Sequence, residues 1–251
     1  MRLPLRAFIA AATIAASVLP LARINAQAAP TAAVVPWATG EHLEYNVKYG
    51  FLKAGSARMD VLGTDTIRGR TAWRLRLNIT GGTWGISIDD DYDSWLDVET
   101  LNSLRFLQNL DELGKTHKRD YAIFPERAMF HQEGKPERPS VTNPLDDAAF
   151  FYFLRTIDLV VGKEYSFNRY FDPDANPVII RVLRKEKISV PAGNFETIVI
   201  QPIIKTSGLF SQKGEAKLWL TDDKRHMLVQ LKTNFGPASL GLYLTSFSGT
   251  P

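Results

Sequence analysis

The chain has 251 residues, and its 30 Lys and Arg residues exceed its 27 Asp and Glu residues by three. Arg2, Arg6 and Arg23 lie in the first 28 residues, so the remaining chain has 30 − 3 = 27 basic residues against 27 acidic ones. This balance excludes the net basic field that attracts nucleic acid, and the absence of cysteine excludes disulfides, thiol nucleophiles, cysteine metal ligands and a lipid-modified cysteine.

Residues 1–28 have the pattern of a secretory signal peptide. A short basic start precedes a mostly apolar run over residues 7–22, and Ala26-Gln27-Ala28 has the small-residue pattern that signal peptidase cleaves. A membrane anchor is the alternative, but the run is shorter than the ~20 apolar residues that cross a bilayer. We therefore predict cleavage near Ala28, export to the periplasm or the outer envelope, and no transmembrane segment in the mature chain.

The next segments predict a linker and then a β-rich domain. Residues 29–39 are rich in Ala, Pro and Val and are predicted to form a flexible N-terminal linker. Residues 40–248 are predicted to form a single β-rich domain, because apolar and polar residues alternate along many short segments separated by turns. Before residue 140 the predicted strands cover residues 43–49, 57–61, 73–79, 84–88, 104–110, 119–124 and 127–131, and residues 133–143 are predicted to form a loop.

Residues 144–156 predict a helix. Asn143 is suited to cap it, Pro144 suits its first position, and Asp146 and Asp147 lie where the helix dipole favours negative charge. The rest of the segment is apolar on nearly every side, so the helix must be surrounded, and only strands are available to surround it. The predicted fold is therefore mainly β, a strongly curved antiparallel sheet or partly open barrel wrapped around one central α-helix.

The chain after the helix returns to strand patterns. The predicted strands are 165–171, 178–187, 195–204, 216–221, 228–233 and 240–247. Ile198, Val199 and Ile200 leave no polar face, so that strand is predicted to be covered on both sides.

Three separated stretches resemble the bacterial envelope family called domain of unknown function 3108. They are residues 40–50 (GEHLEYNVKYG) with Ala54-Gly55, the helix after Asn143, and residues 190–195 (VPAGNF) with Trp219-Leu220. The resemblance covers most of residues 40–247 and implies a signal peptide and a place in the periplasm or on the cell surface. The family supplies no catalytic residues. The chain departs from the family pattern at Met227, where a proline is expected.

The densest acidic cluster is the first candidate for a site. In a strand, Asp89, Asp91 and Asp93 would share one face and offer oxygen ligands to a hard cation. The alternative is a solvated outer face, which we favour because such cations need more ligands than one strand face offers. The histidines lack metal-ligand spacing, and no serine or glycine motif of a hydrolase or phosphate loop occurs. We therefore predict no catalytic residue, no metal and no cofactor.

Large aromatic residues are the second candidate. A core role is the plain interpretation, since most buried aromatic rings serve packing. The sharper hypothesis is an apolar pocket between helix and sheet. Its candidate lining residues are Trp73, Trp84, Phe150, Phe153 and Trp219.

These observations predict an exported, non-enzymatic envelope protein that binds an apolar or amphiphilic, lipid-like molecule between the helix and the curved sheet. The first alternative is a structural module that docks an envelope protein through a sheet edge or an exposed turn. The second is a hydrolase of envelope glycans, which would need two carboxylates ~5–10 Å apart in a cleft.

Overall fold

The computed structural model describes residues 32–83, 86–112, 115–204, 216–235 and 238–250. The predicted signal peptide lies outside this part of the chain. The strands are β1 (His42–Tyr49), β2 (Leu52–Ile67), β3 (Arg70–Thr83), β4 (Ile86–Asp97), β5 (Ser103–Glu112), β6 (Lys115–Phe124), β7 (Met129–Gln132), β8 (Arg138–Pro139), β9 (Glu164–Phe167), β10 (Val178–Val190), β11 (Gly193–Ile203), β12 (Lys217–Thr221), β13 (Leu228–Phe235) and β14 (Ala238–Ser248). The helices are α1 (Asp147–Leu154) and two 3-10 turns, η1 (Pro125–Arg127) and η2 (Pro173–Ala175).

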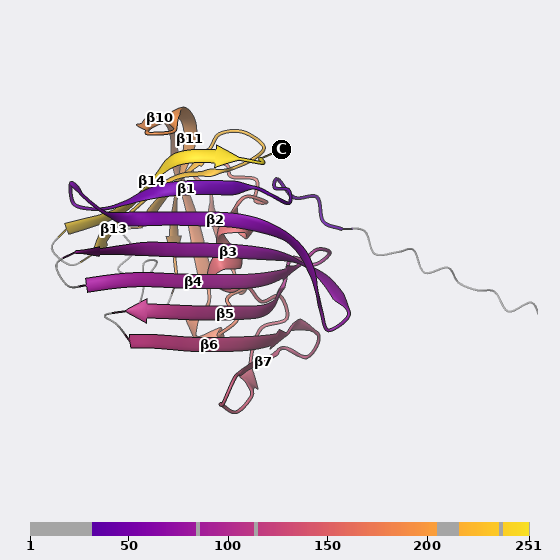
Figure 1. The fold of residues 1–251 in the computed structure, drawn as a ribbon. Coiled ribbons are helices and arrows are strands. Elements are labelled where there is room, and N and C mark those ends of the chain that lie inside the picture. Colours follow the sequence, from indigo (N-terminus) through magenta and orange to yellow (C-terminus); the bar gives the residue numbers. More distant parts are fainter. Residues whose placement is uncertain (1–31, 84–85, 113–114, 205–215, 236–237, 251) are drawn as a thin grey trace, which may run out of the picture. The chain divides into compact units, whose positions relative to one another are not determined.

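All fourteen strands belong to one sheet in the order β8-β7-β6-β5-β4-β3-β2-β1-β14-β13-β12-β11-β10-β9. Every neighbouring pair is antiparallel. The first and last strands therefore pair in the middle of the sheet, and the two edge strands are consecutive in the chain. In Figure 1, β1–β6 form the near layer, and β10 and β11 cross behind them. The structure confirms the predicted mainly β fold, with one antiparallel sheet and, among the described residues, one α-helix.

The connection between the two sheet edges contains α1. No ladder pairs β8 with β9 in the described residues, so the sheet is open there. The connection is instead fastened locally, because the Leu145 N–H donates to the Arg169 carbonyl (2.5 Å) and the Leu145 carbonyl accepts from the Phe171 N–H (3.0 Å). Arg138 on β8 also pairs with Asp172 (3.2 Å). These contacts fasten the segment before the helix to the segment before η2.

Helix α1 begins later than the sequence predicts. The N-cap is Asp146, whose carboxylate accepts a hydrogen bond from the Ala149 N–H (2.9 Å), so the prediction of Asn143 as cap and Pro144 as first helical residue was wrong. Asp146 is the N-cap because its position is also fixed by residues outside the helix. The Ser94 hydroxyl donates to its carboxylate (2.6 Å), and the Asp146 N–H donates to Ser103 Oγ (3.0 Å). These bonds place the helix start against β4 and β5.

One apolar core fills the space between helix and sheet. Every residue from Ala148 to Leu154 is at most 8% exposed. The core joins the helix to β1–β7 on one side of the chain and to β10–β14 on the other. Trp37, which lies within the predicted linker, is 3% exposed and belongs to this core, so the folded part extends N-terminal to Gly40. No helix in the described part of the chain has the length and apolar character needed to cross a membrane.

A buried ion pair fixes the C-terminal end of α1. Arg155 donates to both carboxylate oxygens of Glu41 (2.5 and 2.9 Å), and the two side chains are 1% and 0% exposed. Arg155 also donates to the carbonyls of Pro36 (2.8 Å) and Arg225 (3.0 Å). Since the three partners come from different segments, this guanidinium ties the helix end to β1 and to the turn before β13.

The cap carboxylate of Asp146 should make stability depend on pH. Burial raises the pKa of Asp146 from 3.8 to about 6, although the hydrogen bonds from Ala149 and Ser94 oppose this shift. The folded state then binds more protons than the unfolded state between these pKa values, so the free energy of unfolding falls as pH rises from about 4 to about 6.

We expect Asp146→Asn to remove this decline, because an asparagine oxygen still accepts from Ala149 but does not ionise. The wild type should lose on the order of 2–3 kcal/mol across this pH range relative to the variant, measured by urea unfolding. Equal pH dependence of the two proteins would contradict the assignment.

Candidate functional site

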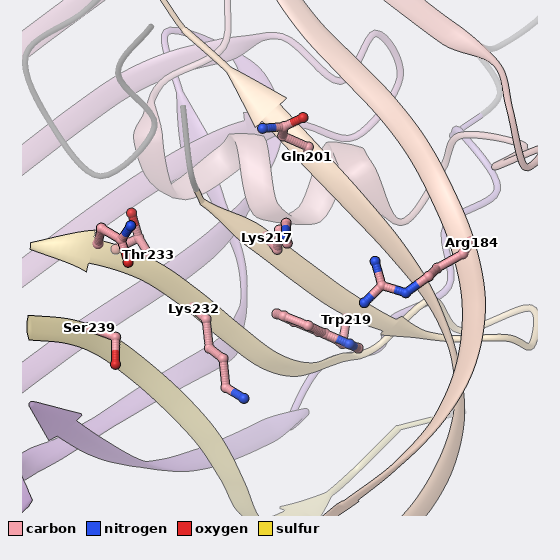
Figure 2. A pocket seen from close by; sticks show the side chains of 8 residues that line it. Arg184, Gln201, Lys217, Trp219, Lys232, Thr233 and Ser239 are labelled. Atoms are coloured by element: carbon pink, nitrogen blue, oxygen red, sulfur yellow. The ribbon is translucent and has the colours of Figure 1, made fainter. Parts of the chain in front are cut away.

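The described part of the chain contains a hollow of about 470 Å³ on β10–β14. This size falls within the range of about 300–1,000 Å³ that is usual for small-molecule sites. Figure 2 shows the side chains around it, with the coiled ribbon of α1 behind the strands. The lining residues are Arg184, Gln201, Lys217, Trp219, Lys232, Thr233, Asn234 and Ser239.

The hollow lies on the face of the sheet opposite the core. Side chains alternate between the two faces of a strand, and in β12 Leu218 and Leu220 belong to the core cluster whereas Trp219 does not. Trp219 is nevertheless only 5% exposed. Its cross-strand neighbour Val199 is fully buried on the same face, so among the described lining residues the apolar group is the Trp219 indole.

Polar and charged groups hold the Trp219 ring in place. Its Nε1–H donates to Glu186 Oε1 (2.5 Å), and that carboxylate also accepts two hydrogen bonds from Arg184 (both 2.9 Å). The Arg184 guanidinium, followed by the indole N–H, lowers the pKa of Glu186. Lys232 Nζ lies 5.5 Å from the centre of the indole ring, a distance at which a cation is attracted to the π face. Figure 2 shows Arg184 and Lys232 directed toward the ring from strands on either side.

Two lysines that line the hollow lie side by side on neighbouring strands. Lys217 on β12 and Lys232 on β13 are direct cross-strand partners, and like charges in that position destabilise a sheet. Neither lysine forms an ion pair with a carboxylate in the described part of the chain. An anion held between the two ammonium groups would relieve this repulsion.

The rest of the lining supplies neutral hydrogen-bonding groups. Gln201, Asn234 and Ser239 also line the hollow, and no carboxylate belongs to the lining among the described residues. An indole ring, two lysines without a described carboxylate partner and neutral polar groups together suit a ligand that carries both an anionic group and an apolar part.

The structure separates the aromatic residues predicted to line a pocket. Phe150 and Phe153 are 3% and 8% exposed in the core, and Trp73 is half-buried against the same core. Trp219 lines the hollow on the opposite face, and Trp84 lies outside the described residues. The structure therefore does not bring the four described residues of this set together.

The acidic cluster forms hydrogen bonds and ion pairs with residues of β3. Asn78 donates to Asp89 (3.3 Å) and Asp91 (3.0 Å), and Asp93 accepts two hydrogen bonds from Arg76 (2.7 and 2.8 Å). Among the described residues, no group of three or more His, Cys, Asp or Glu side chains could hold a metal ion.

Sequence reasoning missed the cations of the hollow. Lys217 and Lys232 lie in strands that were predicted, but their pairing depends on the register of β12 and β13, which the sequence does not give. One available signal was the alternation of Lys217 and Trp219 with two leucines, which places a tryptophan and a lysine on the same, non-core face.

Solved structures resemble this chain in fold. A β-barrel-like protein of domain of unknown function DUF1849 from Brucella abortus matches with a TM-score of 0.52 at 8% identity, over 86% of this chain and 99% of that one. A candidate lipoprotein from Parabacteroides distasonis matches with a TM-score of 0.38 at 12% identity, over 85% and 97% of the two chains. A candidate exported protein with a YmcC-like fold from Bacteroides fragilis gives 0.31 at 11% identity, over 87% and 100%.

A search among curated proteins gave no match. The sequence profile of a protein family of unknown function, DUF3108, matches residues 44–245. This range includes every described residue that lines the hollow, as well as α1 and its cap. The match covers most of the chain and confirms the resemblance seen in the sequence; the chain therefore belongs to the DUF3108 family of proteins of unknown function.

Proposed function

We propose that this protein is an exported, non-enzymatic binding protein of the cell envelope, and that it binds an amphiphilic molecule with an anionic group in the hollow on β10–β14. The observation that carries the proposal is Trp219, an almost fully buried indole on the non-core face of the sheet, with unpaired lysines beside it. Export is supported by the signal-peptide pattern of residues 1–28.

The hollow fits this ligand class better than the helix–sheet space does. The helix residues are packed on all sides by core residues, whereas the hollow presents an indole ring together with two lysines. An apolar chain lying against Trp219 would leave its anionic group near Lys217 and Lys232. The ligand would thus gain both burial of apolar surface and two charge-assisted contacts.

The remaining alternatives receive less support. A glycan hydrolase needs a pair of carboxylates in its cleft, and the hollow has none among its lining residues. Asp146 caps α1 and Glu41 is paired with Arg155, so both have structural partners.

The proposal predicts that ligand capture depends on the lysine pair. Purified protein incubated with an envelope lipid extract should carry a bound anionic amphiphile in native mass spectrometry. Lys217→Gln/Lys232→Gln should weaken binding by about tenfold or more, because each charge-assisted hydrogen bond contributes about 1.5–3 kcal/mol. The variant removes a cross-strand repulsion together with the contact between Lys232 and the indole face, so its stability should stay close to that of the wild type, as measured by urea unfolding.

Lys224→Gln is the matched control, because Lys224 is an exposed lysine in the turn between β12 and β13 and does not line the hollow. It should bind as the wild type does. Wild-type protein that captures no amphiphile, or captures it equally well without the lysine pair, would overturn the proposal.

A further inference from the structure

The turn between β1 and β2 exposes two adjacent large apolar side chains. Phe51 is 89% exposed and Leu52 is 55% exposed. Single exposed apolar residues are common on protein surfaces, but a nearly uncovered phenylalanine next to an exposed leucine, at the outermost point of a hairpin, is unusual. Figure 1 shows this turn projecting at the left end of β1 and β2.

The turn is held in a defined position. Gly50 adopts a φ of 61°, in the left-handed region that glycine enters without strain. Its N–H donates to the Ser239 carbonyl at the start of β14 (2.7 Å). The hydrogen bond anchors the base of the turn to the neighbouring strand, so Phe51 and Leu52 are presented together.

A pair of lysines lies immediately behind this apolar tip. Lys48 and Lys53 are direct cross-strand partners, one step from the paired Tyr49 and Leu52. Like charges so placed repel each other, and neither lysine forms an ion pair with a described carboxylate. Lys48 instead lies over the Tyr243 ring, 5.0 Å from its centre.

The sequence around the tip excludes negative charge. No Asp or Glu occurs between Glu44 and Asp60, or anywhere after Asp223. These two stretches contain the last five residues of β1, the first half of β2 up to Met59, and all of β13 and β14. Four adjacent strands of the sheet therefore reach this end of the molecule with basic and neutral side chains only.

We propose that this tip docks on an anionic lipid bilayer. Phe51 and Leu52 would enter the boundary between headgroups and acyl chains, and Lys48 and Lys53 would lie at the level of the lipid phosphates. Apolar residues at the tip, with cations one residue further back, match the arrangement of a bilayer surface, in which the acyl chains lie deeper than the charged headgroups. Each basic residue close to an anionic membrane adds attraction.

The inference is independent of whether the hollow binds a ligand, although the two features are neighbours. Ser239, whose carbonyl fixes the turn, also lines the hollow. Docking through the tip would therefore bring the hollow close to the lipid surface.

Co-sedimentation of the signal-cleaved protein with vesicles tests the proposal. It should bind vesicles of phosphatidylcholine mixed with phosphatidylglycerol, and more weakly vesicles of phosphatidylcholine alone. Phe51→Ser/Leu52→Ser should weaken binding by about a hundredfold or more, because two large apolar side chains are then no longer buried. Lys48→Gln/Lys53→Gln should weaken binding to the anionic vesicles and remove its dependence on salt.

The matched control is Val160→Ser/Val161→Ser, which removes another adjacent pair of exposed apolar side chains, 37% and 45% exposed. It should leave vesicle binding unchanged. Failure of the wild type to bind anionic vesicles, or equal loss with the control pair, would overturn the proposal. So would a concentration-dependent dimer that the Phe51 and Leu52 substitutions abolish, since the occupant of the tip would then be a second copy of the chain. None of these results would affect ligand binding in the hollow, which the lysine pair Lys217 and Lys232 tests separately.

Discussion

Replacing Arg155 with methionine should lower the free energy of unfolding by about 3–5 kcal/mol, the usual cost of removing one partner from a buried ion pair. The Glu41 carboxylate, 0% exposed, would lose both hydrogen bonds from the guanidinium. The carbonyls of Pro36 and Arg225 would lose their donor as well. Urea unfolding monitored by circular dichroism would measure the change.

The double variant Glu41→Met/Arg155→Met tests the physical reason. Because it leaves no unpaired charge in the core, it should be more stable than Arg155→Met alone, as is found when buried ion pairs are replaced by apolar residues. If the double variant were less stable than either single variant, the cost of removing one charge would not come from leaving the other charge unpaired.

Truncating Phe153 to alanine should cost on the order of 3–5 kcal/mol, because it would leave a cavity in a closely packed core. Phe153 is 8% exposed, its ring lies edge-on to Phe167 at 5.2 Å, and the Arg169 guanidinium covers it at 4.5 Å. The melting temperature would fall by several degrees or more.

Phe51→Ala is the matched control for this truncation. It removes the same atoms from a residue that is 89% exposed, so the melting temperature should change little. Equal melting temperatures of the wild type and Phe153→Ala would mean that α1 is not enclosed by the sheet.

The sequence was sufficient for the main features of the fold. Period-two alternation located β1, β3 and β12, and the all-apolar segment Ile198–Ile200 correctly indicated a strand covered on both faces, since its residues are at most 3% exposed. The helix was found but its start was not. Asn143 and Asp146 are both good caps in isolation, and the choice depends on Ser94 and Ser103, which come from strands far away in the chain.

The candidate site was less accessible to sequence reasoning. Phe150 and Trp219 are similar signals in a sequence, since each is a large aromatic residue among apolar neighbours. Only the alternation along β12 and its register with β13 show that Trp219 faces away from the core and toward Lys232. Cross-strand lysine pairs such as Lys217–Lys232 arise from long-range pairing, so composition and spacing along one strand do not reveal them.

The most direct test of the account is to ask which tryptophan senses a bound anionic amphiphile. The five indole N–H signals in a ¹H–¹⁵N spectrum can be assigned with five Trp→Phe variants. On titration with decyl phosphate, the signal of Trp219 should shift, because the apolar chain would lie on its ring, while those of Trp37 and Trp73 in and against the core should stay in place. Shifts of Trp37 and Trp73 with an unchanged Trp219 would place the ligand between helix and sheet and contradict the account.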